Sequence, residues 1–180
     1  MSSYKAIKEK FSQLSADEKE TLLKDIYHFS KDMRLFLETR LLGETGEEFV
    51  KQMKKETIGK VYKEGIPGTP NGRLVNSIIS KAKKSHVDIK VLLELEKLAY
   101  RGFIESLNKY GGGPDNFIDM GCEHLEAYLT LVKNEIKDKA KQKQLFLEVK
   151  KYLLAKDNML TDYVDGVYEE VTGIPVERYG

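Results

Sequence analysis

Residues 87–110, VDIKVLLELEKLAYRGFIESLNKY, decide the fold of this chain. Their apolar side chains recur every three or four residues, the spacing that places them on one face of an α-helix. The stripe consists of Leu92, Leu95, Ala99, Phe103, Leu107 and Tyr110. Residues 111–114 read Gly-Gly-Gly-Pro, which ends a helix because glycine is too flexible and proline lacks the amide hydrogen. We therefore predict a long helix that stops near Tyr110.

A second helix is predicted to begin at Pro114 or Asp115, directly after this break. Its apolar side chains repeat with the same spacing and are Ile118, Cys122, Leu125, Leu129, Val132 and Ile136. Two such stripes can bury each other when the helices run antiparallel. The sequence thus predicts a central helical hairpin over about residues 86–138.

Helical spacing also recurs on both sides of the hairpin, and each apolar set is expected to face inward. The sets are Tyr4, Ile7, Phe11 and Leu14; Leu22, Leu23, Ile26 and Tyr27; Met33, Phe36, Leu37 and Leu41; Val50, Met53 and Val61; Leu74, Val75, Ile78, Ile79 and Ala82; residues 145–155; and Leu160, Val164, Val167 and Val171. Residues 64–72, EGIPGTPNG, are predicted to form an irregular loop because they hold three glycines and two prolines. No segment alternates as a strand does. We predict an all-α fold of eight or nine helices, packed as antiparallel hairpins in a single domain over residues 1–180.

Three serines have positions typical of helix N-caps. Ser15 and Glu18 have the spacing of a capping box, in which each side chain binds the other residue's amide. Ser30 precedes the third predicted helix. Ser85 is expected to cap the central helix, with Asp88 three residues further on.

The composition indicates an ordinary globular protein, with 41% hydrophobic and 33% charged residues among 180. The single cysteine excludes an internal disulfide framework. No apolar run approaches the roughly 20 residues of a membrane span, and the charged N-terminus does not read as a signal peptide. These features favour the cytoplasm and predict no membrane partner.

The net charge of +1 hides blocks of opposite sign. Residues 51–90 hold ten basic and three acidic side chains, and residues 129–156 hold eight and three. In contrast, residues 91–128 hold three basic and seven acidic side chains, and residues 157–180 hold one and six. Patterned charge of this kind steers association more than it stabilises a fold.

The basic blocks supply the best candidate binding surface. The predicted electrostatic patch consists of Lys54, Lys55, Arg73, Lys81, Lys83, Lys84, Lys139, Lys141 and Lys143. Lysine acts as a point charge, so such a patch would bind nucleic acid without reading its bases. Ordinary solvated helix faces are the alternative interpretation. Reversal of Lys81, Lys83 and Lys84 to glutamate is predicted to leave the fold intact.

Cys122 and His124 could form part of a metal site or a nucleophilic pair. Zinc needs four ligands, however, and the other histidines, His28 and His86, lie on different predicted helices. Cys122 also belongs to the apolar stripe, where a free cysteine behaves as a small hydrophobic residue. We therefore predict a shielded thiol at the core and no metal ligand.

Two further patterns have a structural interpretation. Residues 111–116, GGGPDN, could present amides to an anion, but no lysine follows as in a phosphate-binding loop, and Asp115 would repel phosphate. The acidic residues of the hairpin are Glu94, Glu96, Asp119, Glu123 and Glu126. They lack the Glu-x-x-His spacing of a di-iron bundle, so a solvated face is predicted.

Several segments together support a resemblance. These are Leu14-Ser15, LLKDIY at 22–27, the Pro/Gly loop that leads into a basic helix, and the long helix that ends near 111–113. With them, the chain resembles a family of small all-helical bacterial proteins of unknown function. The resemblance implies an all-α fold, and it supplies neither an activity nor catalytic residues.

The sequence thus favours a non-enzymatic helical module that binds a protein partner or itself. Binding of nucleic acid through the lysine-rich helices is one alternative. An enzyme with a dispersed polar site is another, and it would need a deep pocket that holds several titratable groups. No catalytic residue, metal ligand or cofactor is predicted.

Overall fold

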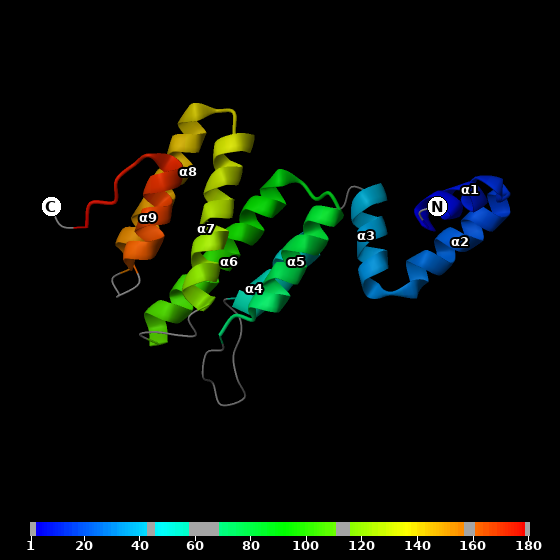
Figure 1. Cartoon of the computed structure of the whole chain (residues 1–180), viewed down its shortest axis with the longest axis horizontal. Coiled ribbons are helices and arrows are strands. Elements are labelled where there is room, and N and C mark those ends of the chain that lie inside the picture. Colours follow the sequence, from blue (N-terminus) through cyan, green and yellow to red (C-terminus); the bar gives the residue numbers. More distant parts are fainter. Residues whose placement is uncertain (1–2, 43–45, 58–68, 111–115, 157–160, 179–180) are drawn as a thin grey trace. The chain divides into compact units, whose positions relative to one another are not determined.

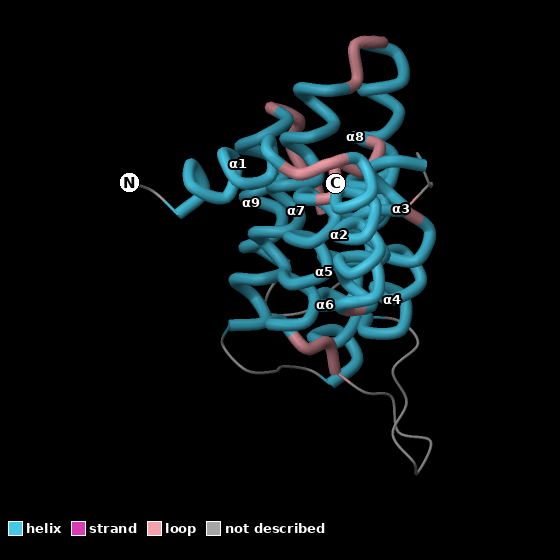
Figure 2. Tube along the Cα trace, turned by 90° about the vertical axis from the view of Figure 1, so that its right-hand side faces the viewer, coloured by secondary structure: helices cyan, strands magenta, loops and turns pink. Residues whose placement is uncertain are grey.

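The computed structural model describes residues 3–42, 46–57, 69–110, 116–156 and 161–178. Within these ranges every regular element is an α-helix (Figures 1 and 2). The helices are α1 (Ser3–Gln13), α2 (Ala16–Phe29), α3 (Lys31–Leu42), α4 (Glu47–Thr57), α5 (Gly72–Lys84), α6 (Ile89–Tyr110), α7 (Asn116–Glu135), α8 (Lys139–Leu154) and α9 (Thr161–Thr172). The predicted all-α fold is therefore confirmed.

The chain divides into two compact units, Met1–Glu44 and Thr45–Gly180. The prediction of one domain over residues 1–180 stays a prediction. Several expectations fall outside the described residues, namely those for Val61, for the first part of the loop at 64–72, for the turn at 111–115 and for Leu160.

The second unit is organised around the predicted hairpin. Helices α6 and α7 run antiparallel in the middle, α4 and α5 pack against α6, and α9 packs against α7 with α8 beside it (Figure 1). The end of α5 and the start of α8 lie at the same end of this unit as the turn from α7 to α8. The side-chain amide of Gln142 in α8 fixes that turn by donating to the main-chain oxygens of Val132 and Lys133.

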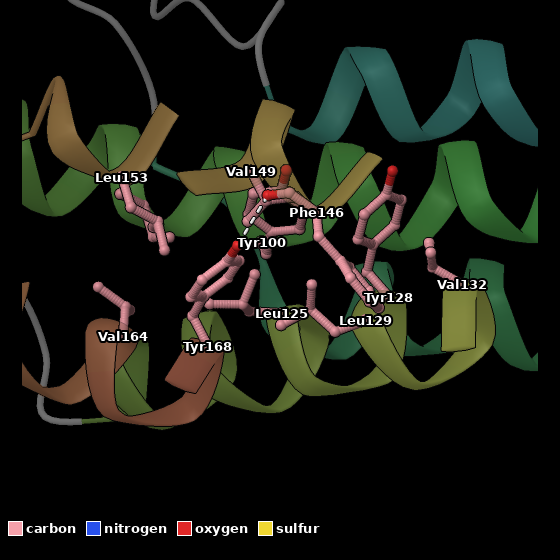
Figure 3. Close-up of a cluster of buried hydrophobic side chains, with 11 residues drawn as sticks. Tyr100, Leu125, Tyr128, Leu129, Val132, Phe146, Val149, Leu153, Val164 and Tyr168 are labelled. Carbon is pink, nitrogen blue, oxygen red and sulfur yellow. Dashed lines mark hydrogen bonds between the residues drawn. The ribbon is translucent and has the colours of Figure 1, made fainter. Parts of the chain in front are cut away.

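Because α6 and α7 are covered on two sides, each buries more than the one stripe that its spacing predicted. Leu95, Ala99, Phe103 and Leu107 are buried as expected, but Tyr100 and Ile104 on the neighbouring face are buried as well. Both belong to one buried cluster, and Figure 3 shows the position of Tyr100 in it. Tyr100 joins a cluster with α7, α8 and α9, in which the Tyr168 hydroxyl donates to the Phe146 oxygen at 3.0 Å.

Helix α6 begins later than the sequence indicated, and its cap is a different residue. Asp88 accepts from the Lys90 amide at 2.7 Å and so supplies the N-terminal hydrogen bond that was predicted for Ser85. Ser85 instead ends α5, with its amide bound to the Lys81 oxygen. The chain turns between the two helices through His86, which has a φ of 53°.

Helix α8 also starts earlier than predicted. The sequence indicated a helix from residue 145, whereas α8 begins at Lys139. Asp138 caps it by accepting from the amides of Ala140 and Lys141. The Asp138 carboxylate accepts hydrogen bonds from two amides that would otherwise be unpaired at the start of the helix. Its negative charge also offsets the lysines in the first turn of α8, because a positive charge is unfavourable at the N-terminal end of the helix dipole.

The first unit consists of α1, α2 and α3, and α2 packs against α3. Both bonds of the predicted capping box between Ser15 and Glu18 are present, and Ser30 accepts from the Met33 amide at 3.1 Å, which confirms it as the cap of α3. The expected burial was wrong, however. Leu22 and Leu23 are exposed, and helices α1 and α2 hold no buried residue along their described lengths.

Helices α4 and α5 agree with the sequence in part. In α4, Met53 is buried as predicted, together with Phe49, whereas Leu74 in α5 is exposed although its neighbours on the predicted face are buried. Helix α4 approaches α6 closely at Gly102, where an added Cβ would lie 2.6 Å from the Thr57 Cβ. A glycine at this position is therefore what permits the close contact between the two helices.

None of the helices in the described part of the chain is both long and apolar enough to cross a membrane.

Candidate functional site

A buried polar network joins three helices of the second unit. The Oε2 atom of Glu96 in α6 lies 2.8 Å from Nδ1 of His124 in α7. The other carboxylate oxygen, Oε1, accepts from the Lys83 ammonium in α5 at 3.1 Å. Glu96 is only 1% exposed, so its charge is removed from water and is compensated inside the protein.

The burial of Glu96 corrects the prediction of a solvated acidic face. Asp119, Glu123 and Glu126 are exposed as predicted, and Glu94 is half-buried. Glu96, in contrast, precedes Phe103 by two helical turns and lies at the edge of the stripe that carries Phe103. A charged side chain at that edge reads as solvated from the sequence, and it is buried because His124 of α7 and Lys83 of α5 cover it.

His124 lies in an aromatic surrounding and has one unused nitrogen. Its ring stacks on Phe103 with 6.0 Å between centroids and 8° between planes, and Phe103 in turn packs edge-on against Phe117. A carboxylate oxygen accepts, so Nδ1 donates to Glu96 and Nε2 is the ring nitrogen that this contact does not use. Nε2 is buried, and no described residue forms a hydrogen bond with it. A carboxylate-bound histidine with a bare Nε2 is the arrangement of general bases and of metal ligands, yet this Nε2 is closed off from solvent.

Cys122 lies apart from that network although it is close to His124 in sequence. It packs against the cluster around Tyr128 and Leu129, whereas His124 faces α6. Burial raises the pKa of the Cys122 thiol to about 11, and the nearby carboxylates of Asp119 and Glu123 add to this effect. Among the described residues, no three His, Cys, Asp or Glu side chains gather in a way that could hold a metal ion.

A polar pocket of about 740 Å³ opens where the first turns of α5 and α7 meet. Arg73 and Glu123 supply its charges, and three asparagines supply amide groups. Its lining consists of Thr69, Pro70, Asn71, Gly72, Arg73, Asn76, Asn116, Phe117, Met120 and Glu123. Hydrogen-bonding groups of this kind could hold a small polar molecule, but neither Glu96 nor His124 lines the pocket.

The residues of the predicted electrostatic patch fall into two groups. Lys81, Lys83 and Lys84 occupy the end of α5, and Lys139, Lys141 and Lys143 occupy the start of α8, so these six share one end of the second unit (Figure 1). Lys54 and Lys55 lie near the end of α4, and Arg73 lies in the first turn of α5, away from that end. Lys83 also differs from its neighbours because its ammonium binds the buried Glu96.

The first unit holds an apolar groove between α2 and α3, with a volume of about 480 Å³. Its lining residues are Glu20, Leu23, Lys24, Tyr27, Leu37, Glu38, Leu41 and Leu42. Leu41 and Leu42 are 64% and 72% exposed, far more than leucines of a core. The sequence predicted that Leu23, Leu37 and Leu41 face inward, whereas Leu23 and Leu41 are exposed and Leu37 is half-buried.

Comparison of the chain with protein-family models, with curated proteins and with solved structures finds no match. The function must therefore be argued from the geometry alone.

Proposed function

We propose that this chain is a non-enzymatic helical module that binds a protein partner or a second copy of itself through its N-terminal unit. One observation carries the proposal, namely the apolar groove between α2 and α3 with its exposed leucines. Exposed apolar groups that gather in a groove are a typical signature of a surface that binds an amphipathic helix. The single cysteine and the many charged residues support a cytoplasmic setting.

A photoreactive amino acid placed at Leu41 of the full chain, in the native host, tests this proposal. Leu41 lines the groove, whereas Asp25 lies on the opposite face of α2 and serves as the control position. We expect a cross-linked protein when the photoreactive residue is at position 41 and none when it is at position 25. The cross-link at position 41 should be lost when Leu23→Glu places a charge in the groove. Equal products at both positions, or no product at 41, would overturn the proposal.

Nucleic-acid binding is the second candidate, and one observation favours it. The lysines at the end of α5 and those at the start of α8 share one end of the second unit. Fluorescence anisotropy with duplex DNA and single-stranded RNA at low salt would test this. Binding of this kind would have a Kd on the order of 10⁻⁴ to 10⁻⁶ M and would fade steeply with salt. Reversal of Lys84, Lys141 and Lys143 to glutamate should then abolish it, whereas reversal of Lys54 and Lys55 should not.

A further inference from the structure

Helix α1 carries an apolar stripe that its own unit leaves largely exposed. Tyr4, Ile7 and Phe11 follow one another at helical spacing and are exposed, Tyr4 by 73% and Ile7 by 62%. The helix is also basic, with Lys5, Lys8 and Lys10 against one glutamate. An 11-residue helix is about 16 Å long, so the stripe extends along most of its length.

The groove between α2 and α3 complements α1, because it is apolar like the stripe of α1 and carries charge of the opposite sign. Its floor is apolar, and its charged lining residues are Glu20, Glu38 and Lys24. Helix α2 itself holds four acidic side chains and two lysines. A basic amphipathic helix therefore matches this groove both in its apolar face and in the sign of its charge.

The α1 of the same copy does not fill the groove. Only Leu14 and Ser15 lie between α1 and α2, and the two hydrogen bonds of the capping box fix the start of α2 there. Every residue of α1 is exposed, and none of them lines the groove. Its stripe contacts α2 at Phe11, where the Lys19 ammonium lies 5.7 Å from the ring centroid. A second copy of the chain supplies the same stripe without the constraint of the two-residue connection.

We propose that two copies of this chain form a symmetric dimer in which α1 of each copy lies in the α2–α3 groove of the other. Such a pairing is isologous, because each copy gives a stripe and a groove and receives the same from its partner. In this dimer the stripe and the groove of each copy are both covered, and the lysines of α1 lie near Glu20 of the other copy. This inference rests on the proposed function, since it names the occupant of the same groove.

The mass of the full chain in solution gives the first test. Light scattering after size-exclusion chromatography should show a dimer that dissociates on dilution. Ile7→Glu with Phe11→Glu should make the chain monomeric at the same concentration. The matched control is Ala6→Glu with Gln13→Glu, which adds the same charge to the opposite face of α1 and should leave the dimer intact. A monomeric parent chain, or a dimer that both double variants leave intact, would overturn the proposal.

Charge reversal tests the pairing of α1 with the groove without touching an apolar residue. Lys8→Glu places a second negative charge near Glu20 and should raise the dimer dissociation constant several-fold. Adding Glu20→Lys should restore it, because the two charges have then changed places across the interface. Both variants should keep the helical circular dichroism of the parent, since both residues are exposed. Failure of the second substitution to restore the dimer would contradict this geometry.

A cysteine pair identifies the occupant directly. In the full chain carrying Ile7→Cys and Leu41→Cys, mild oxidation should give a disulfide-linked dimer, and the control pair of Ile7→Cys with Asp25→Cys should not. A disulfide within one chain would mean that α1 folds into its own groove, which rules out the exchange. If the photoreactive residue at position 41 captures a different protein and the chain stays monomeric, the dimer is excluded while the proposed function stands.

Discussion

Nδ1 of His124 lies 2.8 Å from Oε2 of Glu96, although 28 residues separate the two in sequence. Both side chains are buried, and the same carboxylate also binds Lys83. A buried charge is tolerated only when it is compensated, so the three helices α5, α6 and α7 are held in one register by this contact.

Removal of the carboxylate should destabilise the second unit strongly. Glu96→Ala leaves the buried His124 and the Lys83 ammonium without their acceptor, and we expect a loss of about 3 kcal/mol in the free energy of unfolding. Chemical denaturation checks this, with the exposed Glu123→Ala as the control, which should change stability by no more than about 0.5 kcal/mol. The double variant Glu96→Leu with His124→Leu should cost less than Glu96→Leu and His124→Leu together, because neither buried partner is then left without the other and the half-exposed Lys83 ammonium is solvated. Additive losses would show that the two residues act independently.

Lys83 should behave differently from the lysine beside it. Its side chain is 52% exposed, so the ion pair with Glu96 is screened in part, and Lys83→Ala should cost no more than about 1 kcal/mol. Lys83→Glu should cost more, since it brings a second carboxylate against a buried one. Lys84→Glu is the control, because it places the same charge in the last turn of α5 without replacing the partner of Glu96, and it should lower the midpoint of urea unfolding less than Lys83→Glu does. The reversal of all three lysines is therefore expected to destabilise the fold through Lys83, which revises the prediction from the sequence.

The hairpin could be predicted because its signals are local. The 3- and 4-residue spacing from Leu95 to Leu107 and the break after Tyr110 need no knowledge of the partner helices. The helix caps were harder, because Ser85 and Asp88 both have suitable side chains. Only the turn through His86 decides that Asp88 is the cap.

The buried network could not be predicted, because burial of Glu96 depends on contacts between distant segments. In sequence, Glu96 stands between Leu95 and Lys97 and reads as a solvated residue. Its burial requires α5 and α7 to meet on that side of α6. The opposite error occurred at Leu22 and Leu23, because an apolar stripe shows that a face needs covering, but not what covers it.

Gly102 should not tolerate a larger residue. An added Cβ would lie 2.6 Å from the Thr57 Cβ and 3.3 Å from its Cα, and the backbone of α4 cannot move away cheaply. We expect Gly102→Ala to cost about 1–3 kcal/mol through overpacking. Gly166 in α9 is the matched control, because an added Cβ would meet nothing within 4 Å. Gly166→Ala should stabilise the protein by about 0.5–1 kcal/mol, as alanine is the better helix former. Thermal unfolding of the two variants should move in opposite directions.

Cys122 should react slowly with thiol reagents. Burial raises the pKa of its thiol to about 11, so the reactive thiolate is scarce at neutral pH. The rate of labelling by a chromogenic disulfide in the native protein should rise about tenfold for each pH unit between 7 and 10, in proportion to the thiolate fraction. A rate that levels off near pH 9, where an unperturbed thiol is half ionised, would contradict a shielded side chain.

The buried tyrosines should make the fold sensitive to alkali. Burial raises the pKa of Tyr100, Tyr128, Tyr152 and Tyr168 above the ordinary value of 10.0. A raised pKa means that the folded protein holds the phenolic proton more tightly than the unfolded chain does. The resulting stability is complete below pH 10 and is lost as the pH rises above it, because only the unfolded chain then ionises readily.

Two substitutions separate this effect from general alkaline damage. Tyr128→Phe keeps the buried ring and removes one phenol, so the free energy of unfolding should fall less steeply above pH 10 than in the parent. Tyr163→Phe removes an exposed phenol and should leave the slope unchanged. Urea unfolding between pH 8 and pH 11.5 measures both slopes, and the absorbance of tyrosinate at 295 nm follows ionisation in the same samples. The phenols of Tyr100, Tyr128 and Tyr168, which are buried, and that of Tyr152, which is half-buried, should ionise only as the protein unfolds. If Tyr128→Phe and Tyr163→Phe have the same slope as the parent, burial of the Tyr128 hydroxyl contributes nothing to the alkaline transition.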